Sequence, residues 1–528
     1  MSALTGTRPL LAITARQDGR NIAPWVGLIS VLSASSILAY AWIFPDARER
    51  AQLAATLGAN PALSLVFGPA RDLMTADGFN AWRAGGLGTL FAGLMTILIV
   101  VRNSRANEDS GQAELLASGV LARESRLAVA VLLAAAASVA LGVVSFAVTV
   151  ACGGGVTATL ILSATFTASG LMFAGVAAVT AQLGSDARTA SSVAIATLGI
   201  CYVLRGYLDS SGAPGWTSWT TPFGWLQRTE PATGNDPWPV LAALALTSVL
   251  IAAAFTLQHR RDFGSGLIAT RPGPADGALT SVWALAVRLH RGALASWLLA
   301  FAGLGLVFGN LATSIGDVIA RNPAAAKVLA SGAAGSTDLT FAFVATILQI
   351  VGIIAAVMGA QVILRIYAEE LDYRVEPLLA GAVPRARYLA SNVAVALAAT
   401  ATGMLVAGTG LGVVAAGADR AISPGDVVAQ AAATVPAVWV LVALATAAVG
   451  AAPSRRLVAW LGIAAAFGLT LLGPTFKLPG WALGISPLRH VPTVTGAAPG
   501  WGGLVALGAV AVLLLAVGFA GYHRRDII

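Results

Sequence analysis

The sequence predicts an all-α polytopic membrane protein, with about 12 transmembrane helices arranged as two parallel six-helix repeats. First, hydrophobic residues make up 57% of the 528 residues and charged residues only 11%, whereas soluble domains carry about 25% charged residues. Second, apolar runs long enough to cross a bilayer recur along the chain. Third, two charged stretches about half the chain apart resemble each other, which indicates an internal repeat.

The repeat is defined by a charged stretch that follows the second apolar run of each half. A shift of 262 positions aligns the two copies at two glutamates and one arginine: Glu108 with Glu370, Glu114 with Glu376, and Arg123 with Arg385. Both halves also end in the sequence His-Arg-Arg-Asp, at residues 259–262 and 523–526, a shift of 264 positions. Because the two spacings agree closely, the chain is predicted to consist of two similar halves.

The first half is predicted to cover residues 1–262 and to begin with an interfacial helix at 1–22. Its charged segment covers 102–126, between the second and third spans. A mostly polar loop at 45–83 and a tryptophan-rich loop at 208–236 are placed on the opposite side of the membrane, where aromatic residues are expected at the interface. The spans are predicted at about 24–44, 84–101, 127–151, 155–182, 189–207 and 237–257.

The stretch 263–290 is predicted to be a cytoplasmic linker, rich in Gly and Pro, that ends in a second interfacial helix. The second half then covers 291–528, with its charged segment at 365–388. Its spans are predicted at about 292–314, 339–364, 388–416, 425–450, 457–473 and 500–521.

Basic residues give the orientation. Most of the 32 Lys and Arg residues fall in segments on one side of the predicted spans, which the positive-inside rule assigns to the cytoplasm. We therefore expect a multi-pass protein of a bacterial inner membrane, with both termini and both charged segments cytoplasmic. The net charge of +8 is explained by this orientation and does not indicate binding to nucleic acid.

The chain shows no energy source of its own. An ion-driven carrier usually places acidic residues or histidine inside its spans, but none of the 24 acidic residues lies at the centre of a predicted span, and the four histidines lie in loops or at span ends. A proton relay is therefore poorly supported, although backbone carbonyls could still bind sodium. Lys327 and Lys477 do not stand in a phosphate-binding loop, and Cys152 and Cys201 are interpreted as buried, inert thiols. We expect no catalytic or metal site.

The two charged segments are the remaining candidates for function. A solvated loop, whose charges keep it out of the bilayer, is the simplest interpretation of one copy. Because glutamates, a glycine and an arginine recur at the same spacing in both copies, a functional contact is favoured. Two equivalent segments on the cytoplasmic face suit two copies of a soluble partner, and acidic residues near the start of a short helix suit its dipole.

The segment Arg105-Ala-Asn-Glu-Asp-Ser-Gly-Gln-Ala-Glu-Leu-Leu-Ala-Ser-Gly resembles the Arg-x-Glu-Glu-x-Gly-Arg-x-Glu-Leu-Leu pattern of actinobacterial ABC-2 type permeases. These are the fused, twelve-span exporters of polyketide antibiotics, or tetronasin-resistance proteins. The linker that follows His259 and the overall length are also similar. The chain departs from the pattern at Asn107 and Gln112, and at Pro377 of the second copy, so the two segments are expected to be unequal.

The resemblance implies an ABC-2 exporter-like permease, not an enzyme by itself, that extrudes hydrophobic drugs or antibiotics through the bilayer. It implies two copies of a cytoplasmic nucleotide-binding ATPase subunit, which would bind ATP and Mg. It makes the charged segments the coupling helices that contact this subunit, through Glu108, Glu114, Arg123, Glu370, Glu376 and Arg385. It places the substrate path along the spans that carry Phe91, Met95, Tyr202, Phe343 and Gln349, for which ordinary packing is the alternative.

Two alternatives to this function remain open from the sequence. An ion-driven secondary multidrug carrier also commonly has two parallel six-span halves. An ABC exporter of a native lipid or glycolipid would have the same architecture as a drug exporter. The identity of the substrate is not encoded in any motif of the sequence.

Overall fold

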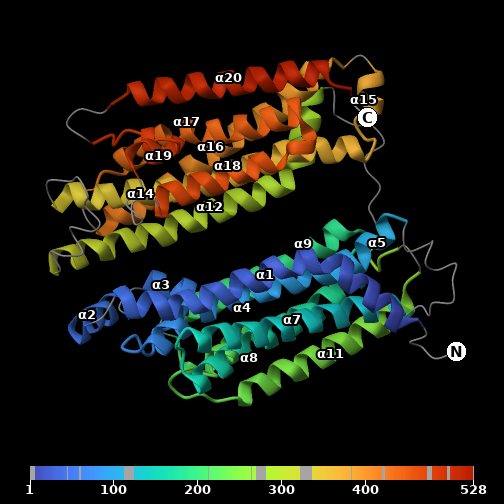
Figure 1. Cartoon of the computed structure of the whole chain (residues 1–528), viewed down its shortest axis with the longest axis vertical. Coiled ribbons are helices and arrows are strands. Elements are labelled where there is room, and N and C mark those ends of the chain that lie inside the picture. Colours follow the sequence, from blue (N-terminus) through green and yellow to red (C-terminus); the bar gives the residue numbers. More distant parts are fainter. Residues whose placement is uncertain are drawn as a thin grey trace. The chain divides into compact units, whose positions relative to one another are not determined.

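The computed structural model describes residues 6–43, 46–58, 61–111, 124–211, 213–262, 265–268, 281–321, 336–381, 383–418, 422–472, 479–495 and 500–526. All regular elements in these residues are helices (Figure 1). Eleven of the helices are long and apolar enough to cross a membrane. The predicted fold class, an all-α polytopic membrane protein, is therefore confirmed.

The chain folds as two compact units, residues 1–273 and 274–528. The long helices of the first unit are α1 (Thr7–Ile43), α4 (Ala76–Asn103), α7 (Ser125–Ala151), α8 (Val156–Leu183), α9 (Ala187–Ser210) and α11 (Trp238–Arg260) (Figure 1). Shorter helices are α2 (Ala47–Gly58), α3 (Pro61–Phe67), α5 (Arg105–Asp109), α10 (Pro222–Gln227) and the 3-10 helix η1 (Gly215–Thr220). Helix α5 and helices α2 and α3 lie at opposite ends of this unit (Figure 1).

Helix α8 is the centre of the first unit, since α4, α7, α9 and α11 all pack against it. Its sequence is rich in Ala, Gly, Ser and Thr, the small residues that let helix backbones approach closely in a membrane. At Gly175, for example, a Cβ atom would lie only 2.9 Å from Leu250 Cβ of α11. The position of α8 is thus explained by its small side chains.

The second unit repeats this packing. Its helices are α12 (Val282–Arg321), α14 (Ser336–Leu371), α15 (Glu376–Ala380), α16 (Arg385–Ala418), α17 (Pro424–Ala451), η2 (Pro453–Arg455), α18 (Leu457–Phe467), η3 (Gly468–Leu472), α19 (Gly480–Leu483), η4 (Pro487–His490) and α20 (Gly502–Arg524). Helix α17 is central and packs against α14, α16, α18 and α20. At Gly450, where α17 meets α20, a Cβ atom would lie 2.1 Å from the Gly518 carbonyl oxygen, so only glycine fits.

Four elements differ from the sequence prediction. The interfacial helix and the first span are one continuous helix, α1, which includes Pro24. The second interfacial helix and the span after it are likewise one helix, α12. The region 45–83 is largely helical, because it contains α2, α3 and the start of α4. Helix α4 begins at Ala76, where the Thr75 hydroxyl accepts a hydrogen bond from the Gly78 amide and caps the helix. The predicted span 457–473 is present only as α18 and the π-helical turn η3, so a twelfth membrane span remains a prediction.

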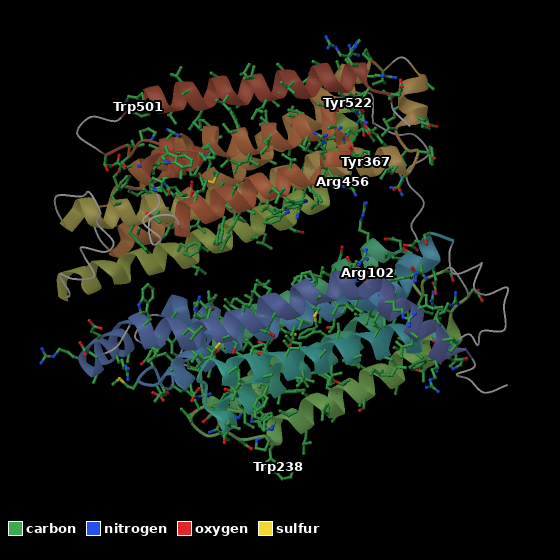
Figure 2. The ribbon with its side chains drawn as sticks, in the orientation of Figure 1. Arg102, Trp238, Tyr367, Arg456, Trp501 and Tyr522 are labelled. Carbon is green, nitrogen blue, oxygen red and sulfur yellow. The ribbon has the colours of Figure 1, made fainter. Side chains whose placement is uncertain are left out.

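Exposed tryptophans mark the ends of the apolar helices. Trp238 is 72% exposed at the start of α11, and Trp501 is 53% exposed before α20. In Figure 2, Trp238 lies at the opposite end of the first unit from Arg102, and Trp501 lies at the opposite end of α20 from Tyr522. This is the distribution expected of residues that anchor helices at a membrane–water interface.

Candidate functional site

A buried cluster of charged residues joins the charged segment of the first unit to the end of its last helix. Glu108, in α5, accepts hydrogen bonds from Arg261, which follows α11: Nη2 to Oε1 at 2.6 Å and Nη1 to Oε2 at 2.9 Å. Arg105 donates to the same carboxylate, Nη1 to Oε2 at 2.6 Å. The side chains of Glu108 and Arg261 are only 8% and 6% exposed. Two chain segments 153 positions apart are thereby tied together.

Arg105 is the most buried charge in this cluster, with 1% of the residue exposed. Besides Glu108, it donates to the Ser185 and Ser265 carbonyl oxygens, and the Asp109 carboxylate lies 3.9 Å from its Nε. A buried guanidinium is tolerated only where partners replace its lost water. The carboxylates and backbone carbonyls around Arg105 are those partners.

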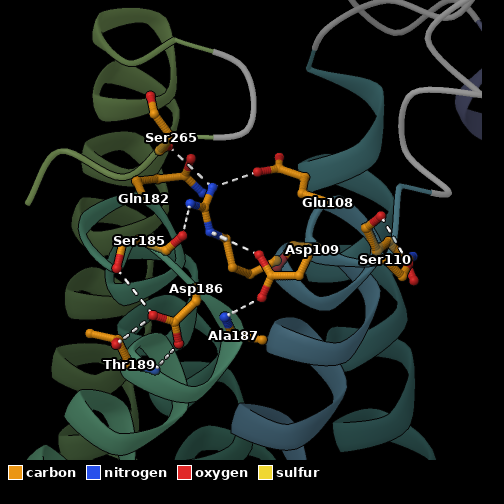
Figure 3. A network of polar contacts seen from close by, with 12 residues as sticks. Glu108, Asp109, Ser110, Gln182, Ser185, Asp186, Ala187, Thr189 and Ser265 are labelled. Carbon is orange, nitrogen blue, oxygen red and sulfur yellow. Dashed lines mark hydrogen bonds and ion pairs between the residues drawn. The ribbon is translucent and has the colours of Figure 1, made fainter. Parts of the chain in front are cut away.

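The turn between α8 and α9 and the start of the inter-half linker complete the cluster (Figure 3). Arg261 donates from Nε to the Gln182 side-chain oxygen at 2.7 Å, and Asp109 accepts from the Ala187 amide at 2.6 Å. The Leu267 amide donates to the Gln182 carbonyl oxygen at 3.1 Å. A Cβ atom at Gly266 would lie 2.3 Å from the Gly184 carbonyl oxygen, so the linker backbone lies directly on this turn.

The turn is itself stabilised by Asp186, the N-cap residue of α9. Its carboxylate accepts from the Thr189 amide at 2.8 Å and from the Thr189 hydroxyl at 2.9 Å. Burial raises the pKa of Asp186, but these hydrogen bonds and those of Ser185 and the Arg188 backbone lower it, and the resulting pKa lies below its usual value. Asp186 is therefore ionised at neutral pH.

The second unit contains the corresponding ion pair. Glu370, near the end of α14, accepts two hydrogen bonds from Arg525, which follows α20: from Nη2 to Oε1 at 2.7 Å and to Oε2 at 2.6 Å. The Glu370 side chain is 3% exposed and that of Arg525 is 13% exposed. Arg525 also lies over the ring of Tyr522, with Cζ 4.8 Å from the ring centroid. Arg385 donates to the Arg525 carbonyl oxygen at 2.9 Å.

The two pairs occupy equivalent positions of the repeat. Glu108 and Glu370 are 262 positions apart, and Arg261 and Arg525 are 264 positions apart, both in the repeated His-Arg-Arg-Asp sequence. In each unit, the pair joins the segment after the second predicted span to the end of the last predicted span. The repeat therefore preserves an interaction as well as a sequence.

The surroundings of the two pairs differ. Glu108 has two arginine partners, whereas Tyr367 stands at the position that matches Arg105. Tyr367 instead lies under Arg456, whose Cζ is 5.1 Å from the ring centroid. Figure 2 shows Tyr367, Arg456 and Tyr522 at one end of the second unit. The first segment is thus held by more buried charge than the second.

The N-terminal part of each half is also attached to this end of its unit. In α1, Asp18 accepts from Arg102 of α4 at 2.5 Å and from Asn103 at 2.9 Å. In the second unit, Arg365 of α14 donates to the Leu289 carbonyl oxygen of α12 at 3.0 Å. The first, the second and the last long helix of each unit therefore meet at its charged segment.

The predicted coupling residues have different environments. Glu108 and Glu370 are buried in intramolecular ion pairs, and Arg385 contacts the backbone of Arg525. Glu376 is exposed in the first turn of α15. Glu114 and Arg123 lie outside the described residues, as does most of the linker, 269–280.

The predicted path residues lie within the packed units. Met95 is fully buried, and Phe91 and Tyr202 pack against the same hydrophobic core. In the second unit, Phe343 packs against the core, and Gln349 donates to the Leu488 carbonyl oxygen at 3.3 Å. Among these residues, Tyr202 lines a cavity, at the end of the first unit opposite Glu108.

Sequence reasoning did not assign roles to Arg261 and Arg525, although it found the repeat that contains them. The signal was available, since an acidic and a basic position recur at shifts of 262 and 264 positions. Arg105, whose counterpart is not charged, carried no repeat signal, although it matches the first residue of the pattern that the segment resembles. Its structural role follows from its burial.

The fold and these ion pairs define a polytopic helical membrane protein built from two similar units. The chain is 37% identical over 545 residues to the multidrug efflux system permease protein Rv1217c of Mycobacterium tuberculosis, with 100% of this chain and 96% of that protein covered. Residues 279–523 match the family described as the C-terminal domain of the multidrug efflux system permease Rv1217c. The chain therefore belongs to the family of this multidrug efflux permease.

Proposed function

We propose that this chain is the permease subunit of an ATP-driven ABC-2 type exporter of hydrophobic drugs in a bacterial inner membrane, with both termini cytoplasmic. The observation that carries the proposal is the buried Glu–Arg pair that recurs at the end of both units, Glu108 with Arg261 and Glu370 with Arg525. Two equivalent charged segments on one chain, each held by such a pair, suit two copies of an ATPase subunit, which would bind ATP and Mg. The relation to a multidrug efflux permease supports drugs as substrates.

In this proposal, the buried glutamates position the charged segments and do not themselves touch the ATPase. Each pair links its segment to the last long helix, and further hydrogen bonds link the same end to the first and second helices. Packed helices transmit displacement because protein interiors resist compression. A movement imposed on the segment would therefore move the whole bundle.

The contact with the ATPase would be made by exposed residues of the segments. In the second unit, Asp372, Tyr373, Arg374 and Glu376 are all exposed between α14 and the first turn of α15. Tyr373 has a positive φ of 56°, a conformation that is uncommon for residues other than glycine. The exposed charges and aromatic ring suit a cytoplasmic protein partner.

The test is co-purification and transport with the ATP-binding subunit. We expect the purified pair to export a lipophilic dye from proteoliposomes only when ATP is present. Replacing Glu114 and Glu376 together, Glu114→Arg with Glu376→Arg, should weaken assembly and lower the ATPase activity. Asp236→Arg is the control, because Asp236 is exposed in the loop before α11, at the opposite end of its unit.

Transport by the chain alone, driven by a pH gradient, would overturn the ATP-driven mechanism and establish an ion-driven carrier. Unchanged assembly and ATPase activity in the double variant would overturn the assignment of the charged segments. Export of a fluorescent phospholipid with no export of drugs would show a native lipid to be the substrate. The path through Phe91, Met95, Tyr202, Phe343 and Gln349 belongs to the same proposal, and substitution of each should change drug selectivity without changing assembly.

A further inference from the structure

The first unit contains a cavity at the end opposite α5 (Figure 1). It has a volume of about 80 Å³ and lies between α4, α8, α9 and the segments at 67–72 and 223–233. One water molecule needs about 10–15 Å³ of such space, so the cavity suits one compact group of a ligand. Arg71 and Glu230 line it with side chains that are 36% and 38% exposed, so the rest of a ligand can extend outward past them.

The cavity has a fixed frame. The Trp82 indole of α4 donates to the Gly68 carbonyl oxygen at 3.0 Å. Arg205 of α9 donates from Nη2 to the Val66 carbonyl oxygen at 3.0 Å, and the Tyr202 hydroxyl donates to the same oxygen. These bonds tie the segment after α3 to α4 and α9, so the wall is in place without a ligand.

Aromatic rings form much of the wall. Phe67, Trp82, Tyr202 and Phe223 all line the cavity, and the ring centroids of Phe67 and Trp82 lie 4.8 Å apart. Aromatic rings pack against apolar groups and attract cations to their faces. One such interaction is present within the protein, since Arg205 Cζ lies 4.6 Å from the centroid of the Tyr202 ring. The wall therefore suits a group that is both apolar and positively charged.

The charged residues of the lining leave an excess of one negative charge. Arg71 Nη2 lies 3.3 Å from Glu230 Oε1, and Arg205 Nη1 lies 3.4 Å from Oδ2 of Asp209, which is outside the lining. Asp72 is the remaining charged residue of the lining. Two arginines thus stand against three carboxylates, which gives a net charge of −1. A monovalent cation would balance it.

Within the described part of the chain, the Asp72 carboxylate has no cation partner. Its Oδ1 accepts from the Met74 amide at 2.8 Å and its Oδ2 from the Thr75 hydroxyl at 2.7 Å, and both bonds lie in an exposed region. A carboxylate can accept about four hydrogen bonds, so each oxygen can accept another. The side chain starts at the cavity wall, because Asp72 Cβ lies 2.9 Å from the position of a Cβ atom added to Gly78, which also lines the cavity. The unbalanced charge of the lining is therefore accessible to a ligand.

The lining discriminates among ligands by their charge. An anion would meet the excess negative charge, and a zwitterionic lipid headgroup would bring a phosphate to the same place. An uncharged molecule would pack against the rings but gain nothing from Asp72. An organic cation gains from both the rings and the carboxylate.

We propose that this cavity binds the cationic head of lipophilic organic ammonium ions. The ammonium group interacts with the Asp72 carboxylate, and its apolar substituents pack against the aromatic wall. The site lies within one unit, and its occupancy does not depend on how transport is energised. It is thus independent of the proposed contact with an ATPase.

The test uses three probes of the purified full chain in an uncharged detergent. Phenyltrimethylammonium is a cation, tert-butylbenzene is its uncharged isostere with carbon in place of nitrogen, and benzoate is an anion. Equilibrium dialysis against protein-free micelles corrects for partition into the detergent. We expect saturable binding of phenyltrimethylammonium, about tenfold weaker binding of tert-butylbenzene and no saturable binding of benzoate.

Asp72→Asn removes the charge and keeps the shape of the side chain, since the amide oxygen can still accept from Met74. It should weaken phenyltrimethylammonium about tenfold and leave tert-butylbenzene unchanged. Asp236→Asn is the matched control, because Asp236 Oδ1 likewise accepts from the amide two positions on, that of Trp238, but Asp236 does not line the cavity. Equal effects of the two substitutions, or equal affinities of the wild type for the cation and its isostere, would overturn the proposal.

Gly85→Leu tests the location of the site by filling the cavity. Gly85 lines it, and a Cβ atom there would meet only Leu162 Cδ1, at 3.6 Å, so the larger side chain can enter the space. Gly199→Leu is the control, because Gly199 of α9 has no atom within 4 Å of an added Cβ and does not line the cavity. Binding of phenyltrimethylammonium should be lost in Gly85→Leu and persist in Gly199→Leu, with thermal unfolding showing that both variants are folded.

Three further results would overturn the proposal. They are unchanged binding of phenyltrimethylammonium to Gly85→Leu, tighter binding of benzoate than of the cation, and no saturable binding of the cation to the folded wild type. None of them bears on ATP-driven transport, which is tested separately with the ATP-binding subunit.

Discussion

The buried pair of Glu370 and Arg525 makes a quantitative prediction. Glu370→Gln preserves the shape of the side chain but leaves the Arg525 guanidinium, of which the side chain is 13% exposed, without its counter-charge. Removal of one partner from a buried pair costs about 3–5 kcal/mol. Because glutamine can still accept one hydrogen bond, we expect a loss of about 3 kcal/mol in the free energy of unfolding, and a similar loss for Arg525→Gln.

The double variant, Glu370→Gln with Arg525→Gln, tests whether the two residues stabilise the protein as a pair or independently. Once one charge is gone, removal of the other leaves no unpaired charge, so the double variant should lose no more than either single variant. The coupling free energy in the double-mutant cycle is then about 3 kcal/mol. It can be measured by reversible denaturation with SDS in mixed micelles.

Asp372 and Arg374 give a matched control cycle at the same end of the unit. Their side chains are 55% and 60% exposed, and the charged atoms lie 3.4 Å apart. Water and salt screen such a pair, so its coupling should be about 0–1 kcal/mol. If the losses caused by Glu370→Gln and Arg525→Gln sum to the loss of the double variant within about 0.5 kcal/mol, the reasoning is refuted.

Three further predictions concern the first unit. Glu108→Gln should cost more stability than Glu370→Gln in the same denaturation assay, because it removes a carboxylate that two buried arginines share. An equal or smaller cost would contradict this. The pKa of Asp186 is lowered from 3.8, so its carboxylate stabilises the fold above that pH, and this contribution is lost as the pH falls through the lowered pKa. The wild type should therefore lose stability relative to Asp186→Asn as the pH falls below 3.8, and parallel pH profiles would exclude the effect. Gly206→Ala should destabilise the protein by about 1–3 kcal/mol, since its Cβ atom would lie 2.1 Å from the Leu65 carbonyl oxygen. Gly199→Ala in the same helix meets no atom within 4 Å and should be neutral. Thermal unfolding of the two variants tests the difference.

The long helices could be predicted from the sequence because the bilayer imposes a length and a composition on every span. Helix starts were less predictable where a polar residue caps a helix before the apolar run. Thr75 is an example, since its hydroxyl starts α4 at Ala76 and so brings Arg83 into the helix. Hydropathy alone places the start of this span after Arg83, because the charged residue lowers the mean hydropathy although the helix continues through it.

The candidate site was only partly predictable. Repetition singled out Glu108 and Glu370, but it could not show whether their carboxylates face a partner or the interior. That distinction depends on Arg261 and Arg525, which lie 153 and 155 positions away in the sequence. An ion pair between such distant residues is set by helix packing, and no local pattern reports it.

The first pair also interacts with the segment that follows Arg261. After Arg261 the chain continues into the linker, whose Ser265 carbonyl oxygen accepts from Arg261 at 2.8 Å and from Arg105 at 3.2 Å. The first pair therefore also holds the start of the linker.

The same carbonyl oxygens explain the role of Arg105 in the first unit. The Ser185 and Ser265 carbonyl oxygens come from the α8–α9 turn and the linker, and both accept hydrogen bonds from Arg105. Arg105 supplies these hydrogen bonds, and the Glu108 carboxylate compensates its charge. In the second unit, Tyr367 at the equivalent position stacks with Arg456 instead. The buried arginine of the first copy is thus explained by the carbonyl oxygens of the turn and of the linker that it meets there.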